Sequence, residues 1–107
     1  MADWRDMRVE GLLICDRIVA VFQVTDSLAR LPFAFFKVKV LERSNGSFFA
    51  CPNVAIRGPT GDPEWIGGLG NTIDEAVEDG LRSFFGTWGD RRDLTDEDFA
   101  WSDPQDF

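Results

Sequence analysis

The chain has 107 residues and a formal charge of −8 at neutral pH. This length supports one hydrophobic core, for which 10 Phe and 4 Trp supply ample material. The acidic balance argues against direct nucleic-acid binding, because phosphates require a basic surface. No apolar stretch approaches the roughly 20 residues of a membrane span, and the first residues do not form a signal peptide. We therefore expect a cytoplasmic protein without membrane contact.

Histidine is absent from the sequence, which removes the commonest catalytic base and metal ligand. The two cysteines, Cys15 and Cys51, are too few for a disulfide scaffold and too far apart in sequence for a zinc site. We expect no metal, no cofactor and no enzymatic activity. A small enzyme that uses carboxylates or Cys51 is the less favoured alternative, because a thiol without histidine is a poor nucleophile at neutral pH.

Residues 8–25 are rich in β-branched and apolar types, which predicts two strands at about 8–14 and 18–25. The clearest element follows them, a β-hairpin in which Asn45-Gly46 is the preferred pair for a two-residue type I′ turn. Such a turn pairs Val40 with Cys51 and Glu42 with Phe49. It places four side chains on one buried face, namely Val38, Val40, Phe49 and Cys51.

The stretch GGLGNTIDEAVEDGLRSFF, residues 67–85, suggests either a phosphate-binding loop or a turn from a sheet into a helix. No lysine follows the glycines, and four acidic residues occupy the first two helical turns, where an anion would bind. Thr72 and Glu75 form a capping box, and apolar residues recur with helical spacing over 73–85. The structural turn is therefore favoured, with Gly80 allowing the helix to approach the sheet. The preceding WIGG, residues 65–68, is expected to be a third strand of the hairpin sheet.

These elements predict an α+β fold, in which an antiparallel sheet of four to five strands is covered on one face by the helix of residues 73–85. The domain is expected to span residues 1–89. Residues 90–107 then form an acidic tail with aromatic residues, which either packs along an edge or remains exposed.

The tail is the candidate partner-binding segment, since residues 93–107 contain six acidic residues, three large aromatic ones and no basic ones. Aromatic side chains would anchor a basic partner and carboxylates would steer its approach. The alternative is that the aromatics close the edge of the core or that the tail only aids solubility. The candidate residues are Asp93, Asp96, Glu97, Asp98, Phe99, Trp101, Asp103, Asp106 and Phe107.

Residues 35–86 resemble the HicB antitoxin family. A strand (FFKVKVLE), a tight turn (RSNGS) and a strand ending in proline (FFACP) precede a helix start similar to the family's G-[DN]-T-x-x-E-A. The matching residues there are Gly70, Asn71, Thr72, Glu75 and Ala76. The resemblance implies a partially degraded RNase-H-like module that binds a small basic RNA-cleaving toxin and blocks its active site. Family members usually carry a DNA-binding segment where this chain has its acidic tail, so direct DNA binding is not expected.

The sequence thus favours a non-catalytic protein that neutralises a basic partner protein, as an antitoxin or immunity protein does. One alternative is a phage-type acidic inhibitor that mimics nucleic acid and acts on a host nuclease or defence complex. Another is a homo-oligomeric structural subunit, possible because open sheet edges can pair into a homodimer. The acidic surface suits the first two equally, and the identity of the partner would separate them.

Overall fold

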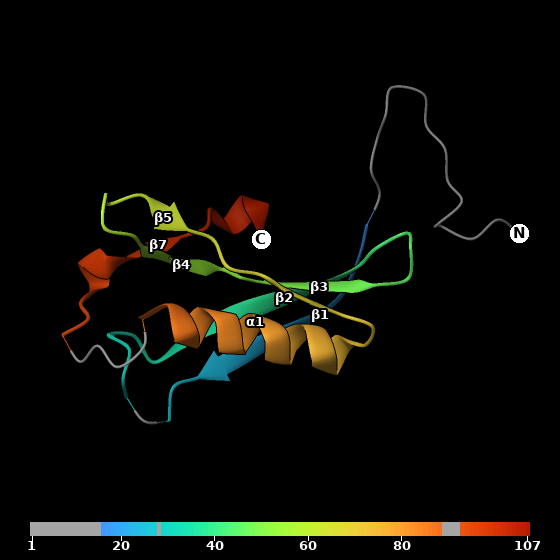
Figure 1. Cartoon of the computed structure of the whole chain (residues 1–107), viewed down its shortest axis with the longest axis horizontal. Helices are drawn as coiled ribbons and strands as arrows, with labels where there is room; N and C mark the ends of the chain where they lie inside the picture. The colour runs from blue at the N-terminus through green and yellow to red at the C-terminus, as the bar shows by residue number, and fades with distance from the viewer. Residues whose placement is uncertain (1–15, 28, 89–92) are drawn as a thin grey trace, which may run out of the picture.

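The computed structural model describes residues 16–27, 29–88 and 93–107, which form two antiparallel sheets and one α-helix (Figure 1). The elements are, in order, β1 (Arg17–Thr25), β2 (Phe35–Glu42), β3 (Phe48–Pro52), β4 (Val54–Arg57), β5 (Pro63–Glu64), β6 (Gly68–Gly70), α1 (Ile73–Trp88), the 3₁₀ turn η2 (Asp96–Asp98), β7 (Phe99–Trp101) and the 3₁₀ turn η3 (Pro104–Asp106). The predicted α+β class and its helix-covered antiparallel sheet are confirmed. The strand expected at residues 8–14 lies outside the described residues.

The strands are divided between a four-stranded sheet of order β1-β2-β3-β6 and a three-stranded sheet of order β5-β4-β7. The chain passes from one sheet to the other at Asn53. The Asn53 amide donates to the Lys37 carbonyl at 2.9 Å, and its side-chain oxygen accepts from the Lys37 amide at 2.9 Å. Asn53 thereby extends the β2–β3 ladder by one residue before the chain enters β4. The second sheet was not anticipated from the sequence.

The hairpin turn between β2 and β3 has three residues, so the predicted two-residue turn is wrong. Arg43 N donates to Ser47 O at 2.8 Å, which closes the loop, and Gly46 N donates to Arg43 O at 2.9 Å. Gly46 has a φ of +88°, whereas Asn45 is not among the described residues with positive φ, and a type I′ turn requires both. The Asn45 side-chain oxygen instead accepts a hydrogen bond from Ser47 N at 2.9 Å.

The extra turn residue shifts the hairpin register by one and corrects the predicted core face. Val40 pairs with Ala50 and Glu42 with Phe48, in place of the expected Cys51 and Phe49. Because side chains alternate along a strand, Phe49 and Cys51 point away from the face that carries Val40. Their places on the buried face are taken by other side chains of β3, of which Ala50 is fully buried.

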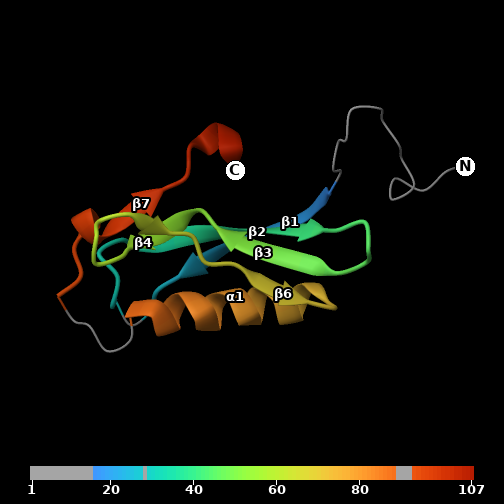
Figure 2. The ribbon, with the colours of Figure 1, turned by 45° about the horizontal axis from the view of Figure 1, so that its top comes forward.

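The helix α1 covers the face of the four-stranded sheet that carries Phe36, Val38 and Val40, each at most 1% exposed (Figure 2). Four helix residues are buried there, Ala76, Gly80, Phe84 and Trp88. The helix thus continues three residues beyond its predicted end at residue 85, and Trp88 joins the core. This is the amphipathic pattern expected from the apolar spacing.

Glycines bring α1 close to β6. A Cβ atom on Gly68 would overlap the backbone of Gly80 and Ala76, and one on Gly80 would lie 3.3 Å from Gly68 N. The expected close approach at Gly80 is confirmed. The third strand of the hairpin sheet begins at Gly68, so its predicted position at residues 65–68 is corrected to Gly68–Gly70. Only glycines leave the space that this helix–strand contact requires.

Carboxylates of α1 bind backbone amides of β6 and of the turn that joins β6 to α1. Thr72 Oγ1 accepts from Glu75 N at 3.1 Å, which is half of the predicted capping box. Glu75 Oε2 accepts from the Asn71 amide at 2.8 Å, one residue before the expected donor, and Asp79 Oδ2 accepts from Leu69 N at 2.9 Å. A phosphate would have to displace these carboxylates, which agrees with a structural turn.

The segment after α1 returns to the fold. The expected domain boundary at residue 89 falls in the part from 89 to 92 that is not described, and β7 beyond it pairs with β4 through Val54↔Trp101 and Ile56↔Phe99. Phe99 is 4% exposed and lies in the same hydrophobic cluster as Phe36. Of the two behaviours expected for the tail, packing along an edge is therefore the one observed.

Candidate functional site

The candidate partner-binding residues divide into three environments, of which the first is the core. Phe99 packs edge-on against Phe33, with ring centroids 5.1 Å apart, and pairs with Ile56 in the second sheet. Because its side chain is buried, Phe99 stabilises the fold and is not available as a contact for a partner. This matches the alternative that aromatic residues of the segment close the core.

The second environment is the acidic turn η2, which Thr95 precedes. Asp96 and Glu97 are exposed, and Asp93 is exposed just before the turn. Asp98 Oδ2 accepts a hydrogen bond from Thr95 N at 2.8 Å, which holds the turn closed. Asp98 thus has a structural role, whereas Asp96 and Glu97 point their charges towards solvent.

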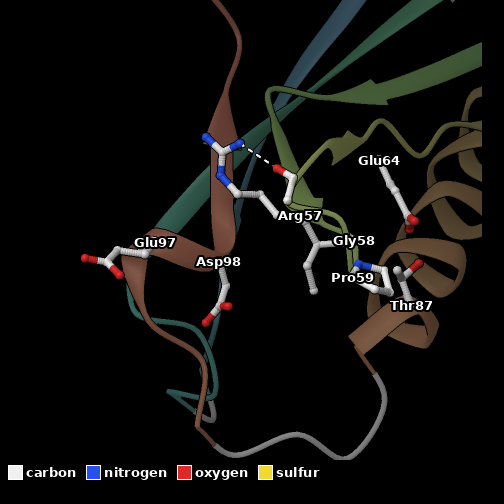
Figure 3. A pocket seen from close by; sticks show the side chains of 9 residues that line it. Arg57, Gly58, Pro59, Glu64, Thr87, Glu97 and Asp98 are labelled. Atoms are coloured by element: carbon white, nitrogen blue, oxygen red, sulfur yellow. Dashed lines mark hydrogen bonds between the residues drawn. The ribbon is translucent and has the colours of Figure 1, made fainter.

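A hollow of about 500 Å³ lies beside η2, between the β4–β5 loop and the end of α1 (Figure 3). Its lining includes the carboxylates of Glu64, Glu97 and Asp98 and one cationic side chain, Arg57. Arg57 Nη1 donates to Gly61 O at 3.0 Å, so this guanidinium is tied to the loop. Figure 3 shows Glu97 and Asp98 on one side of the hollow and Glu64 on the other. The arrangement is a negative rim, not a close carboxylate pair.

The third environment is a hollow of about 410 Å³, lined by Trp101, Asp103 and Phe107 together with Lys39 and Trp65. Trp101 is 47% and Trp65 52% exposed, so two large aromatic surfaces face solvent. The Lys39 ammonium lies 4.9 Å from the centre of the Phe107 ring, a cation–π contact. Such exposed tryptophans are typical of binding surfaces.

Asp103 and Asp106 lie at the start and the end of the turn η3. Asp103 caps η3, because its Oδ1 accepts from Gln105 N at 2.9 Å. Asp106 belongs to η3, and its side chain lies outside what the structure describes. The candidate residues thus separate into an acidic end at η2 and an aromatic end at Trp101–Phe107, which line different hollows.

Cys51 also lines the hollow with the two tryptophans and is half-buried. Burial raises the pKa of the Cys51 thiol, and the neighbouring Lys39 ammonium opposes that rise. The raised pKa keeps the thiol protonated near neutral pH, where it is a weak nucleophile. The sequence had placed this side chain in the core, and the shifted register moves it to the opposite face.

Sequence reasoning missed Lys39 and Trp65 as site residues. The alternation of apolar residues and lysines along β2 does mark Lys39 as facing away from the core. Trp65, however, was assigned to a strand, and no local pattern joins it to Trp101, which is 36 residues later in the sequence. Only the pairing of β7 with β4 brings these two rings to one hollow.

The helix α1 carries further exposed carboxylates: Asp74 and Glu78 lie on its outer side, whereas Glu75 and Asp79 turn towards the backbone at β6. Arg82 Nη2 lies 3.7 Å from Glu78 Oε2, and both side chains are largely exposed. Water and salt screen such pairs, so this one offsets little of the negative charge. The acidic character noted in the sequence is therefore displayed on both α1 and η2.

The structure is that of a small α+β protein with one hollow rimmed by carboxylates and another lined by two exposed tryptophans. No family model, curated protein or solved structure matches the chain. Within residues 16–27, 29–88 and 93–107, no group of three or more Cys, Asp or Glu side chains could hold a metal ion. In the same part of the chain, no helix has both the length and the apolar character needed to cross a membrane.

Proposed function

We propose that this chain is a non-catalytic binding protein that neutralises a basic partner protein, in the manner of an antitoxin or immunity protein. One observation carries the proposal: exposed carboxylates at η2 adjoin a hollow whose rim adds Glu64 and in which Arg57 is the single cation among the lining residues that the structure describes. Arg57 is already hydrogen-bonded to Gly61. The negative charge of the rim therefore favours lysine or arginine side chains of another protein.

Charge at this site acts mainly on the rate of encounter. Carboxylates within about 10 Å of one another act together at 0.1 M salt, and their combined field attracts a basic surface. An individual exposed ion pair contributes only about 0–1 kcal/mol, so affinity has to come from several such contacts and from apolar anchors. The hollow combines a concave surface with negative charge. A concave surface can hold a side chain of another protein, so a protein partner is favoured over free cations.

The nature of the partner is suggested by the HicB-like order of hairpin, short strand and helix in residues 35–86. That resemblance favours a small basic RNA-cleaving toxin. The same carboxylates also suit a mimic of nucleic acid that acts on a host nuclease or defence complex. A competition experiment with nucleic acid separates the two cases. Nucleic acid displaces a mimic from its target, because both occupy the same phosphate-binding groove.

The test is capture of a partner by the full chain, identification of that partner, and titration of its activity with the purified chain. We expect a basic protein whose activity falls to zero at equal stoichiometry. An acidic partner, or one whose activity is unchanged by saturating chain, would contradict the proposal.

A charge variant then locates the contact. Asp96→Asn with Glu97→Gln removes two exposed charges and leaves the Asp98 hydrogen bond to the turn intact. We expect association about tenfold slower at low salt, because electrostatic steering is reduced. The matched control is Asp74→Asn with Glu78→Gln, which makes the same charge change on α1. If both variants slow association equally, the contact is not at η2.

A further inference from the structure

The four-stranded sheet has α1 on one face only, and its other face points away from the helix (Figure 2). The strand register puts a row of apolar side chains on that second face. The register places Ile18 opposite Leu41, Leu41 opposite Phe49, and Phe49 opposite Leu69. Directly paired residues share a face and lie about 5 Å apart, so this row crosses all four strands. Ile18 is 57% and Leu69 56% exposed, which leaves both ends of the row in solvent.

The apolar surface extends along the strands beyond this row. Val21 pairs with Lys39 and Phe35 with Thr25, so both apolar side chains stand on the same face, and they are 53% and 47% exposed. We call the surface formed by Ile18, Val21, Phe35, Leu41, Phe49 and Leu69 the open face. Trp65 and Trp101 line the hollow at its border. A concentration of exposed apolar groups of this kind marks an interaction site.

The charges on and beside the open face differ from those on the rest of the protein. Lys37 and Lys39, the two lysines of the chain, project from it between the apolar residues. The carboxylate of Asp103 lines the bordering hollow together with Lys39. Both signs of charge are therefore present on one surface, whereas carboxylates outnumber the cations Arg57 and Arg82 at η2 and on the outer side of α1.

The charges on the open face indicate which partner suits it. A basic partner would meet the exposed Lys37 ammonium here and is better accommodated by the acidic turn η2. Two copies of a chain with charge −8 repel each other through their acidic surfaces. A surface with both signs lowers this repulsion, because a twofold axis can bring a lysine of one copy towards a carboxylate of the other.

We propose that the open face is the interface of a homodimer, in which two four-stranded sheets pack against each other. Both copies of α1 then lie on the outside, and η2 with its hollow remains accessible to the partner. Packed sheets stand about 10 Å apart with interdigitated side chains, which is the role that Ile18, Phe49 and Leu69 would fill. This inference does not depend on the proposed neutralising function.

The test is the mass of the full chain in solution, measured by sedimentation equilibrium over a wide range of concentration. The expected result is reversible association with a limiting mass of twice 12.1 kDa. Ile18→Thr with Leu69→Thr keeps good strand formers and replaces apolar contacts in both copies. We expect dimerisation about 100-fold weaker, since four buried side chains change at once. Phe22→Thr is the matched control, because Phe22 is exposed but shares the α1 side of the sheet.

A second pair of variants tests the same interface through charge and requires no change of apolar residues. Lys37→Glu should weaken dimerisation about tenfold, because it adds negative charge between two acidic copies. Arg82→Glu makes the same charge change on the outer side of α1 and should have little effect. A chain that stays monomeric at every concentration would overturn the proposal. A dimer that the open-face variants weaken no more than the control variants do would also overturn the proposal.

Discussion

The two faces of the four-stranded sheet are built from alternate residues of the same strands, yet they have different properties. On the covered face, Phe36, Val38 and Val40 pack under α1 and are almost completely buried. On the open face, Lys37 and Lys39 lie between Phe35 and Leu41 along β2, and several apolar side chains of this face are exposed. The covered face stabilises the fold, because burial there removes apolar area from water. Among the described residues, the open face retains apolar area that a second molecule can bury.

The largest effect should come from removing a buried ring beneath α1. Phe84 is 0% exposed, and Phe84→Ala should lower the free energy of unfolding by about 3–5 kcal/mol, because it leaves a cavity. Leu69→Ala on the open face should change the free energy of unfolding by no more than about 0.5 kcal/mol, since Leu69 is 56% exposed. Denaturant unfolding of dilute protein measures both. Equal effects would remove the distinction between the two faces.

The same contrast applies within β7. Phe99 is 4% exposed, so Phe99→Ala should cost about 3 kcal/mol of unfolding free energy. Trp101 is 47% exposed, and Trp101→Ala should cost clearly less. Thermal or denaturant melts of the two variants provide the comparison. If Phe99→Ala is as mild as Trp101→Ala, the segment after residue 93 is not part of the core.

A smaller effect is expected at the contact between α1 and β6. Gly68→Ala should lower the free energy of unfolding by about 1–3 kcal/mol, because its Cβ would overlap the backbone of Gly80 and Ala76. Gly80→Ala is the control. Its Cβ would lie 3.3 Å from Gly68 N, and the tightness of that contact is offset by about 1 kcal/mol of helix propensity. A Gly68→Ala variant as stable as the wild type would refute this close approach.

The smallest effect concerns the Cys51 thiol. Since burial raises its pKa, the thiolate should form at higher pH in the folded chain than in the unfolded chain. The corresponding stability is present below the pKa of the unfolded thiol and is lost as pH rises through the folded pKa. Lys39→Met should raise the pKa further, because it removes the opposing ammonium charge. Thiolate absorbance against pH, in a Cys15→Ser background, measures this. A pKa below that of the unfolded chain would contradict it.

Much of the fold follows from local sequence patterns. Helical spacing and the Thr72 cap predict α1, and the alternation along β2 predicts a two-faced strand. The register could not be predicted from Asn45-Gly46, because the side chain of Asn45 stabilises a three-residue loop instead. The one additional loop residue determines which face of the sheet carries Phe49 and Cys51.

The sequence predicts which types of residue make up the candidate site, but not where their side chains lie in the fold. The acidic and aromatic content of residues 93–107 is evident from the sequence, whereas the burial of Phe99 depends on pairing with β4, which is more than 40 residues earlier. The open face was also missed, since it needs the register of four strands at once. Such non-local contacts have no signal in a local pattern.

The acidic turn η2 of the folded chain is the proposed contact with a basic protein. The most direct test is the association rate constant of the chain with its captured partner, measured over a range of salt concentrations. We predict a rate that falls steeply with added salt and that is lower for Asp96→Asn with Glu97→Gln at low salt. A rate that depends neither on salt nor on these two carboxylates would contradict the account.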